Sequence, residues 1–345
     1  MNLRLINSCD VAGKRVVVRV DWNVTLGKAL QIIDGTRIIR TLPTINWLKN
    51  NGAKQIILLS HLGKAEEKRS LEPVVGYAEQ LLGEEISLHS TAEQCQSDTV
   101  SRVIMLENVR LWAGEDSNDP SFARELSSLG ELYVNEAFGE CHRESASIVG
   151  IAEYLPAYAG LWLEEEVTAI LKVRENPEHP FVVVMGGAKV ADKLPLLKLL
   201  SERADTILVG GRLANELQGE STKLVGRAKI ILPLEGSEIL DIGEETRKIF
   251  AEEIKKAKTI VWNGPMGMVE DVRYRAGTEA VFEAIVRNKG AYSLVGGGDT
   301  LAALGNEAQV AEIDHVSTGG GAMLSLLEKG DLPGLMMLES LPNSE

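Results

Sequence analysis

One stretch of the chain joins a strand, two glycines and two lysines in an order that suits a bound anion. The residues from Val182 to Lys193 read VVVMGGAKVADK, where an apolar run ends at Gly186-Gly187 and Lys189 follows. Glycines let a backbone approach a ligand closely, and lysines beside exposed N–H groups favour an anion. The Walker phosphate loop and the dinucleotide pattern GxGxxG occur nowhere in the sequence, so neither motif explains the stretch.

Other polar residues follow other apolar runs, and the two halves of the chain differ in character. The first half carries the cations or potential cations Arg37, His61, Lys64, Arg110, His142 and Arg143. The second carries Gly210-Gly211-Arg212, Asn263-Gly264-Pro265, Gly296-Gly297-Gly298-Asp299-Thr300 and Gly319-Gly320-Gly321. Fork-like cations suit a small, densely charged anion. Glycines, lysines and a carboxylate suit a polyphosphate with Mg²⁺.

The elements that would position these residues read as strands alternating with helices. Apolar runs occur at RVVVRV, QIILLS, RVIMLE and ELYVNE, and then at FVVVMG, TILVGG, KIILP, TIVWNG and YSLVGG. This alternation predicts an α/β protein with two Rossmann-like, doubly wound parallel-sheet domains joined by a hinge helix. Ligands of such sheets bind outside the carboxyl ends of the strands, so we expect an active-site cleft between the two domains.

The prolines and helical periods suggest four segments. We predict an N-terminal domain over residues 1–157, a helical hinge over 158–176 and a C-terminal domain over 177–318. Residues 319–345 would form a C-terminal segment that packs back toward the N-terminal domain. Pro195 is tolerated only in the first turn of a helix, so the helix after the Gly186-Gly187 pair should begin near Asp192.

Composition narrows the function classes. The 345 residues are 44% hydrophobic and 25% charged, as in an ordinary globular protein, and their length favours two domains. The net charge of −14 argues against nucleic-acid and anionic-membrane partners. Cys9, Cys95 and Cys141 read as free thiols. Without a signal peptide or membrane span, these features predict a cytoplasmic protein.

At this point the residues match a known family, because the chain resembles phosphoglycerate kinase. The resemblance runs from about Val16 to the end, and its motifs occur in order. They are RVDWNV, DGTRI, SHLGK, ENVR, NEAFGECHR, AEYLPAYAG, GGAKVADK, TIVWNGPMG, VGGGDT and STGGGA. A single glycine pair more often marks a turn, and Asp299 alone could be a helix N-cap, but so many features in order favour the family.

The resemblance implies reversible transfer of the acyl phosphate of 1,3-bisphosphoglycerate to Mg-ADP, giving 3-phosphoglycerate and ATP. It assigns catalytic roles to Arg37, Lys189 and Lys193. It implies a phosphoglycerate site formed by Asp21, Asn23, Arg37, His61, Leu62, Gly63, Lys64, Arg110 and Arg143. It implies a nucleotide site formed by Lys193, Gly211, Gly243, Asn263, Glu270, Gly297, Gly298, Asp299 and Thr300. Glu270 would bind the ribose, and Asp299 would face Mg²⁺ directly or through water. The partners would then be small molecules, and the chain a monomer.

The chain departs from the family pattern near the anion site. Lys64 stands where the family has arginine, and the family's NDAFGTAHRAHAS reads NEAFGECHRESAS here. The second change replaces a threonine with Glu140 and is expected to bring Glu136, Glu140 and Glu144 near the anion. The segment between Gly211 and Asp241 is also much shorter than the family norm.

Three function hypotheses remain open from the sequence. The first is an active glycolytic kinase, and the second is a non-catalytic or weakly active phosphoglycerate- and nucleotide-binding protein on the same fold. The acidic changes and the trimmed segment motivate the second. A nicotinamide dehydrogenase would share the arrangement of polar strand ends but lacks GxGxxG.

Lys189 gives the first testable prediction. If its ammonium group meets charge that develops on the transferring phosphoryl group, Lys189→Ala should lower kcat by about 10²-fold or more. Its affinity for ADP should change much less, because the interaction forms late in the reaction. Steady-state kinetics and ADP titration separate the two effects. A variant that loses mainly nucleotide affinity would instead make Lys189 a ground-state contact.

Overall fold

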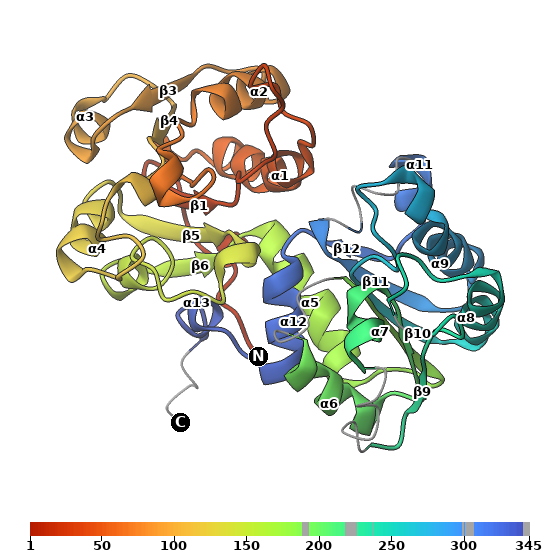
Figure 1. Ribbon diagram of the computed structural model, residues 1–345. Helices are drawn as coiled ribbons and strands as arrows, with labels where there is room; N and C mark the ends of the chain where they lie inside the picture. Colours follow the sequence, from red (N-terminus) through yellow and green to blue (C-terminus); the bar gives the residue numbers. More distant parts are fainter. Residues whose placement is uncertain (188–192, 218–225, 237, 299, 301–306, 341–345) are drawn as a thin grey trace, which may run out of the picture. The chain divides into compact units, whose positions relative to one another are not determined.

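The computed structural model describes residues 1–187, 193–217, 226–236, 238–298, 300 and 307–340. The chain divides into two compact units, of which one comprises Met1–Val167 with the segment from Asp331 onward and the other comprises Thr168–Gly330. Each unit contains one six-stranded sheet in which all strand pairs are parallel (Figure 1). The predicted α/β class with two doubly wound parallel sheets is therefore confirmed.

The first sheet has the strand order β3-β4-β2-β1-β5-β6. Its strands are β1 (Arg15–Val20), β2 (Gln55–Leu59), β3 (Ile86–His89), β4 (Val103–Leu106), β5 (Leu132–Glu136) and β6 (Ala157–Ala159). Its helices are α1 (Thr36–Asn50), α2 (Glu72–Leu82), α3 (Ala92–Ser97), α4 (Pro120–Ser127) and α13 (Pro333–Met336). Strands β1, β2, β4 and β5 lie at the predicted apolar runs, whereas β3 and β6 had no counterpart in the prediction.

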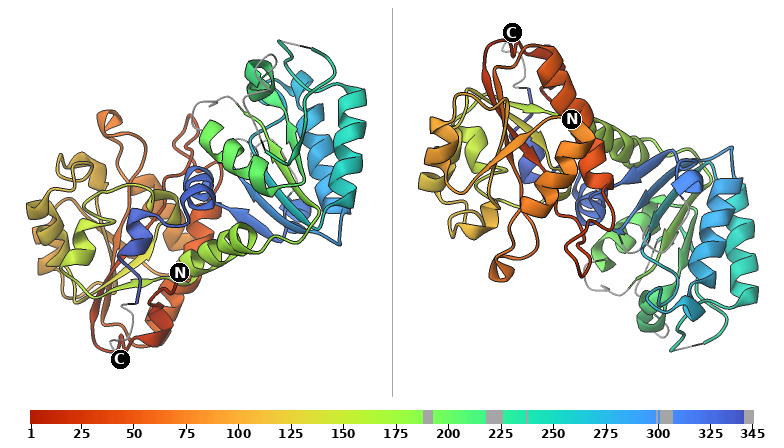
Figure 2. Two further views of the ribbon diagram at one scale, coloured as in Figure 1. Left: turned by 90° about the horizontal axis from the view of Figure 1, so that it is seen from below. Right: turned by 90° about the horizontal axis from the view of Figure 1, so that it is seen from above.

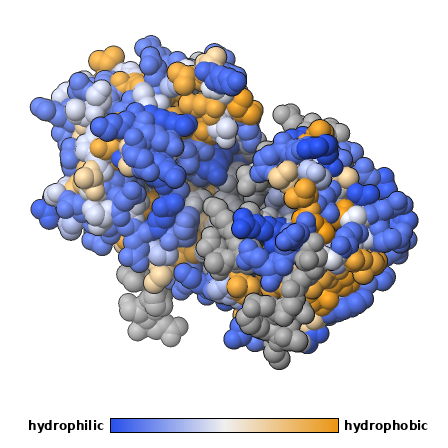
Figure 3. Space-filling model, in the orientation of Figure 1, coloured by the Kyte–Doolittle hydropathy of each residue, from blue (hydrophilic) through white to orange (hydrophobic). Residues whose placement is uncertain are grey.

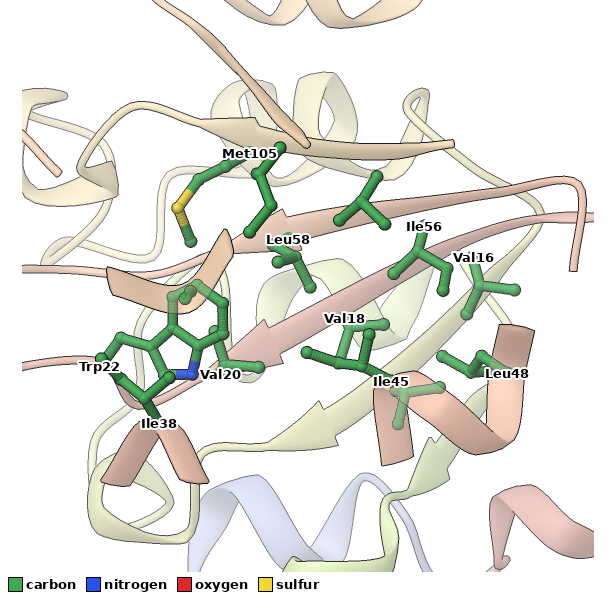
Figure 4. Close-up of a cluster of buried hydrophobic side chains, with 14 of the residues drawn as sticks. Val16, Val18, Val20, Trp22, Ile38, Ile45, Leu48, Ile56, Leu58 and Met105 are labelled. Carbon is green, nitrogen blue, oxygen red and sulfur yellow. The ribbon is translucent and has the colours of Figure 1, made fainter. Parts of the chain in front are cut away.

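The core of the first unit follows from the two-residue period of β1. Val16, Val18 and Val20 share one face of the strand and pack in a single cluster with Ile45 and Leu48 of α1 (Figure 4). Val17 and Arg19 point to the opposite face and are also buried. A parallel sheet covered on both faces explains the nearly continuous apolar run, and it makes the buried Arg19 conspicuous.

The second sheet has the strand order β12-β11-β10-β7-β8-β9. Its strands are β7 (Phe181–Met185), β8 (Thr206–Val209), β9 (Lys229–Ile231), β10 (Thr259–Asn263), β11 (Tyr292–Gly296) and β12 (His315–Ser317). Its helices are α6 (Leu194–Arg203), α7 (Gly211–Leu217), α8 (Glu244–Lys256), α9 (Ala276–Arg287), α11 (Glu307–Val310) and α12 (Gly320–Lys329). Helices α8 and α9 lie side by side over one face, and α6 contacts α12 (Figure 2).

The connector contains the predicted helix, α5 (Leu161–Glu175), and the two units divide within it. The predicted C-terminal segment, residues 319–345, is split between the two units at Gly330 and Asp331. Helix α12 contacts α6 and belongs to the second unit, whereas the residues from Asp331 belong to the first. There the amide of Arg4 donates to the carbonyl of Leu338 at 2.8 Å, and Leu335 and Leu338 are buried.

The surface and the cysteines agree with the expectation from composition of a globular protein with free thiols. Hydrophilic side chains cover much of the described surface on the face in Figure 3. The three cysteines are free thiols, as expected. Among the described residues, no helix has the length and apolar character that a membrane crossing requires.

The N-terminus of α5 is held by a buried carboxylate. Glu136, at the end of β5, accepts hydrogen bonds from the amides of Trp162 at 3.1 Å and Leu163 at 2.8 Å, and from the hydroxyl of Thr44. A negative side chain suits this position because the amides at a helix start carry partial positive charge. Gly160 leaves the required room, since a Cβ there would overlap the Glu136 side chain.

Glu136 gives a pH prediction. Burial raises the pKa of its carboxyl from the ordinary 4.5 to about 7. The folded protein then keeps a proton that the unfolded chain releases, so the free energy of unfolding should fall by about 3 kcal/mol between pH 4.5 and pH 7. Glu136→Gln should remove this component. Urea unfolding of both proteins across the window measures it, and equal pH slopes would contradict the assignment.

Candidate functional site

The carboxyl edge of the first sheet gathers the side chains predicted to bind the small anion. Asp21 follows β1, His61 follows β2 and Arg110 follows β4 on the 3₁₀ turn η3 (Val109–Leu111). Arg37 lies in the first turn of α1, and Arg143 follows the turn η4 (Phe138–Glu140) after β5. Parallel strands place their carboxyl ends at one edge, so residues more than a hundred positions apart meet there.

Asp21 and Arg37 form a direct ion pair at 2.7 Å. The aspartate is 5% exposed, and its charge raises the pKa of the Arg37 guanidinium, against the effect of burial. The next residue, Trp22, anchors the loop, because its amide donates to the Ser60 hydroxyl at 3.0 Å and its indole N–H donates to the Thr41 hydroxyl at 2.9 Å. The loop thus fixes the position of Asp21.

The loop after β2 is held from two sides. The side chain of Asn23 accepts from the Gly63 amide at 2.9 Å, and Arg110 donates to the Gly63 carbonyl at 2.8 Å. Asn108 is fully buried and donates to the carbonyl of Leu62 at 2.9 Å, while its side-chain oxygen accepts from the Arg110 amide at 3.1 Å. Leu62 is buried, so it contributes its backbone and its packing to the site.

Arg19 is a member of the site that the sequence reasoning missed. It is 1% exposed, and one of its terminal nitrogens lies 3.1 Å from Nδ1 of His61. A guanidinium can only donate, so Nδ1 of His61 accepts and the ring proton resides on Nε2. Burial first, and then the charge of Arg19, hold the pKa of His61 well below its ordinary value. His61 is therefore a neutral donor, and among the described residues its Nε2–H has no hydrogen-bond acceptor.

A buried chain of contacts supports Arg19 from behind. Its Nε donates to the hydroxyl of Ser147 at 2.8 Å, and that hydroxyl donates to Glu115 at 2.6 Å. Glu115 is 2% exposed and also accepts from the Ser147 amide at 3.0 Å. The sequence feature that could have identified Arg19 is its charge, since an arginine inside the apolar run RVVVRV needs a partner when it is buried.

Of the three expected acidic neighbours, only Glu140 lies among the cations. Its carboxylate is 2.9 Å from Arg110, 3.2 Å from Arg143 and 3.5 Å from Nε2 of His61. The expectation for Glu136 was wrong, because that carboxylate is buried at the start of α5. Glu144 is solvent-exposed, and none of these cations pairs with it.

Lys64 and Arg143 are the more accessible cations of the set. Lys64 is exposed at the start of the short turn η2 (Ala65–Glu67), and half of the Arg143 side chain is exposed. By contrast, Arg110 is 11% exposed and Arg37 is 32% exposed. The arrangement therefore combines two exposed cations with two that are more buried.

In the second unit, glycines at the strand ends pack against neighbouring backbone. A Cβ on Gly186 would overlap the carbonyl of Pro265, and a Cβ on Gly264 would overlap the carbonyl of Gly186. Gly211 has a φ of +59°, and a Cβ there would lie 2.7 Å from the Gly187 amide. The pair Gly186-Gly187 is thus required because the loops after β7 and β10 approach each other closely. In contrast, no described atom lies within 4 Å of a Cβ built on Gly298.

Polar side chains join these loops. Lys193 directly precedes α6, which begins at Leu194, and its side chain is 7% exposed. Its ammonium group donates to the carbonyl of Gly186. Asn263 donates to the carbonyl of Gly296 at 2.9 Å, and the buried Thr300 hydroxyl accepts from the Gly264 amide at 3.0 Å. These residues fix the carboxyl edge formed by β7, β10 and β11.

The remaining predicted nucleotide residues are more dispersed. Gly243 caps the start of α8 beside Glu235, and Glu270 is exposed in the loop after β10. Gly297 has a φ of +115° and follows β11. Lys189 and Asp299 lie outside the described residues. Within the described part of the chain, no group of three or more His, Cys, Asp or Glu side chains is placed to hold a metal ion.

The first unit thus presents the guanidinium groups of Arg37, Arg110 and Arg143 and a neutral imidazole N–H supported by the buried Arg19, an arrangement suited to a small polyanion. The sequence model of the phosphoglycerate kinase family matches residues 6–230 and 218–330. Relatives described as phosphoglycerate kinase from Herpetosiphon aurantiacus and Chloroflexus aggregans are 37% and 39% identical, with coverage of 98% of this chain and 99% of each relative.

Solved structures agree with the sequence comparison. Phosphoglycerate kinases from Coxiella burnetii and Pyrococcus horikoshii match with TM-scores of 0.84 and 0.85 and identities of 32% and 29%. Each comparison covers 97% of this chain and 98% of the other. The fold and these matches define an α/β kinase built on two parallel sheets. The chain belongs to the phosphoglycerate kinase family.

The buried chain behind His61 gives a stability prediction. Arg19→Met should lower the free energy of unfolding by about 3 kcal/mol, because Glu115 and Ser147 would lose their buried cationic neighbour. Urea unfolding measures the loss. The exposed Arg102, whose guanidinium donates to a surface carbonyl, supplies the control, and Arg102→Met should change stability by about 0.5 kcal/mol or less. Similar small losses in both variants would show that the buried chain contributes little.

Proposed function

We propose that the protein catalyses reversible transfer of the acyl phosphate of 1,3-bisphosphoglycerate to Mg-ADP, giving 3-phosphoglycerate and ATP. The observation that supports this most directly is the cluster of Arg19, Arg37, Arg110 and Arg143 around the neutral His61 at one sheet edge. Guanidinium forks and an N–H donor recognise carboxylate and phosphate oxygens.

The proposed phosphoglycerate site consists of the residues at this edge. Asp21 and Asn23 would orient the substrate hydroxyl, and His61 would donate its Nε2–H to an anionic oxygen. Arg110, Arg143 and Lys64 would neutralise negative charge, while the loop residues Leu62 and Gly63 shape the wall. Arg37 would contact both the substrate and the transferring phosphoryl group, with Asp21 holding its guanidinium in place.

Catalysis in this proposal needs no general base. The group that leaves 1,3-bisphosphoglycerate is a carboxylate, which is a weak base, so positioning and charge neutralisation are the main tasks. Arg37 would serve from the first unit and Lys189 and Lys193 from the second. The reaction also requires the two ligands to meet, so we propose that the units close on each other during each turnover.

The nucleotide would bind at the carboxyl edge of the second sheet. Lys193 would contact its phosphates, Gly211, Gly243 and Asn263 would line its site, and Glu270 would bind the ribose. The turn containing Gly297, Gly298 and Thr300 would approach the phosphates, and this role is supported by the finding that no described atom lies within 4 Å of a Cβ built on Gly298. Mg²⁺ bound to the nucleotide would neutralise phosphate charge. Its proposed protein ligand is Asp299, and a single carboxylate fits because Mg²⁺ usually takes most ligands from phosphate and water.

The setting we propose is a cytoplasmic monomer with small-molecule partners and no nucleic-acid or membrane partner. The net charge of −14 and the free thiols support it. A non-catalytic or weakly active binding protein on the same fold is the second candidate. It is favoured by one observation, the pairing of Glu140 with Arg110 and Arg143.

A coupled assay tests the proposal. Purified protein supplied with Mg-ATP and 3-phosphoglycerate should form 1,3-bisphosphoglycerate, which a dehydrogenase converts with oxidation of NADH. The reaction should require both substrates and Mg²⁺, and omission of each in turn is the control. If calorimetry shows that both ligands bind while no turnover occurs at millimolar substrate, the non-catalytic candidate replaces the kinase.

A further inference from the structure

Glu140 places a negative charge inside the cation cluster of the first unit. Its Oε2 lies 2.9 Å from Nη2 of Arg110 and 3.2 Å from Nε of Arg143, and its Oε1 lies 3.5 Å from Nε2 of His61. Only 10% of this side chain is exposed. One carboxylate therefore pairs with two of the cations that the proposed function gives to the substrate, and it lies near His61 without a hydrogen bond to it.

The position of this carboxylate is fixed by the local backbone. The amide of Glu140 donates to the Ala137 carbonyl at 2.9 Å, and the carbonyl of Glu140 accepts from the Arg143 amide at 2.9 Å. Phe138 and Cys141 on either side are buried. The turn cannot shift easily, so the carboxylate can leave the cations only by side-chain rotation.

The donors that Glu140 uses are the ones an incoming anion needs. Arg110 donates from one terminal nitrogen to the Gly63 carbonyl and from the other to Glu140, so one of its five N–H donors and part of its charge are occupied by Glu140. With Glu140 ionised, the three charges of Arg110, Arg143 and Glu140 sum to one positive charge instead of two. A phosphate group carries about two negative charges at neutral pH, and a like charge beside it is repulsive.

We propose that Glu140 is a resident carboxylate that competes with the anionic group of the substrate for Arg110 and Arg143. It is then a specificity-determining residue that weakens the binding of phosphorylated ligands. This inference about Glu140 depends on the proposed kinase function only for the identity of the substrate. A competing structural role would make Glu140 the counter-charge that keeps the arginines in place, and the two roles predict opposite effects on anion affinity.

The test compares Glu140→Gln, which removes the charge and keeps the shape, with Glu144→Gln. Glu144 is four residues away and exposed, so it supplies the same change of charge without the contact. Calorimetric titration of the full chain with inorganic phosphate and with 3-phosphoglycerate, without nucleotide, gives the dissociation constants. Glu140→Gln should bind each about tenfold more tightly, the equivalent of one charge-assisted contact returned to the ligand. Glu144→Gln should bind about as the unmodified chain does.

Unchanged or weaker binding by Glu140→Gln would overturn the proposal, and weaker binding would establish the structural role. If Glu140→Gln melts at a much lower temperature than the unmodified chain, Glu140→Thr repeats the comparison, because threonine is the residue that the family pattern has at this position. Inorganic phosphate keeps this test separate from the proposed function. If the coupled assay shows no turnover but Glu140→Gln still binds phosphate more tightly, the inference holds and the proposed function fails.

A pH series with sulfate, whose charge is constant, adds a second readout. The groups facing Glu140 are Asp21, Arg19, Arg37, His61, Arg110 and Arg143. Burial and then Asp21 raise the pKa of Glu140, and the arginines oppose this. As the pH falls and Glu140 takes up a proton, the sulfate affinity of the unmodified chain should approach that of Glu140→Gln. A constant ratio of the two affinities at all pH values would contradict the competition.

Discussion

Four guanidinium groups converge on one edge of the first sheet, and their mutual repulsion is the constraint on which the arrangement around them depends. Like charges repel strongly where little water separates them, so each cation needs a partner or a rigid support. Asp21 pairs with Arg37, and Ser147 links Arg19 to the buried Glu115. The apolar cluster around β1 and α1 supplies the rigidity, because it holds the strands whose ends carry these groups.

In the second unit, the strand-end loops are positioned by close packing of backbone against backbone. Its strand-end loops lie so close together that side chains at Gly186, Gly211 and Gly264 would overlap neighbouring peptide groups. This packing brings several loops to one edge without bulky side chains between them. These glycines are thus a requirement of the fold, whereas at Gly298 no described atom lies close enough to exclude a side chain.

The sequence predicted the long central strands well, because buried parallel strands form uninterrupted apolar runs, and it predicted that the connector contains a helix. The strands that it missed, β3, β6 and β12, are three or four residues long and lie at sheet edges, where little apolar pattern accumulates. The residues expected to bind the anion were assigned from family motifs, and that assignment stays a prediction. The roles of Arg19, Glu136 and Glu140 depend on which way a side chain points from its turn, and neither spacing nor composition contains that information.

The division of the chain within α5 and again at Asp331 has a consequence for how the protein folds as it is made. All of the second unit lies in one continuous segment, whereas the first unit includes residues translated after that segment. Leu335 and Leu338 are buried in the first unit, and Ser340 donates to the carbonyl of Asn2 at 2.9 Å. On the ribosome, the unit that begins first is therefore completed last: all six strands of its sheet precede the second unit, but the residues from Asp331 that pack against its N-terminal segment emerge only after that unit has been made.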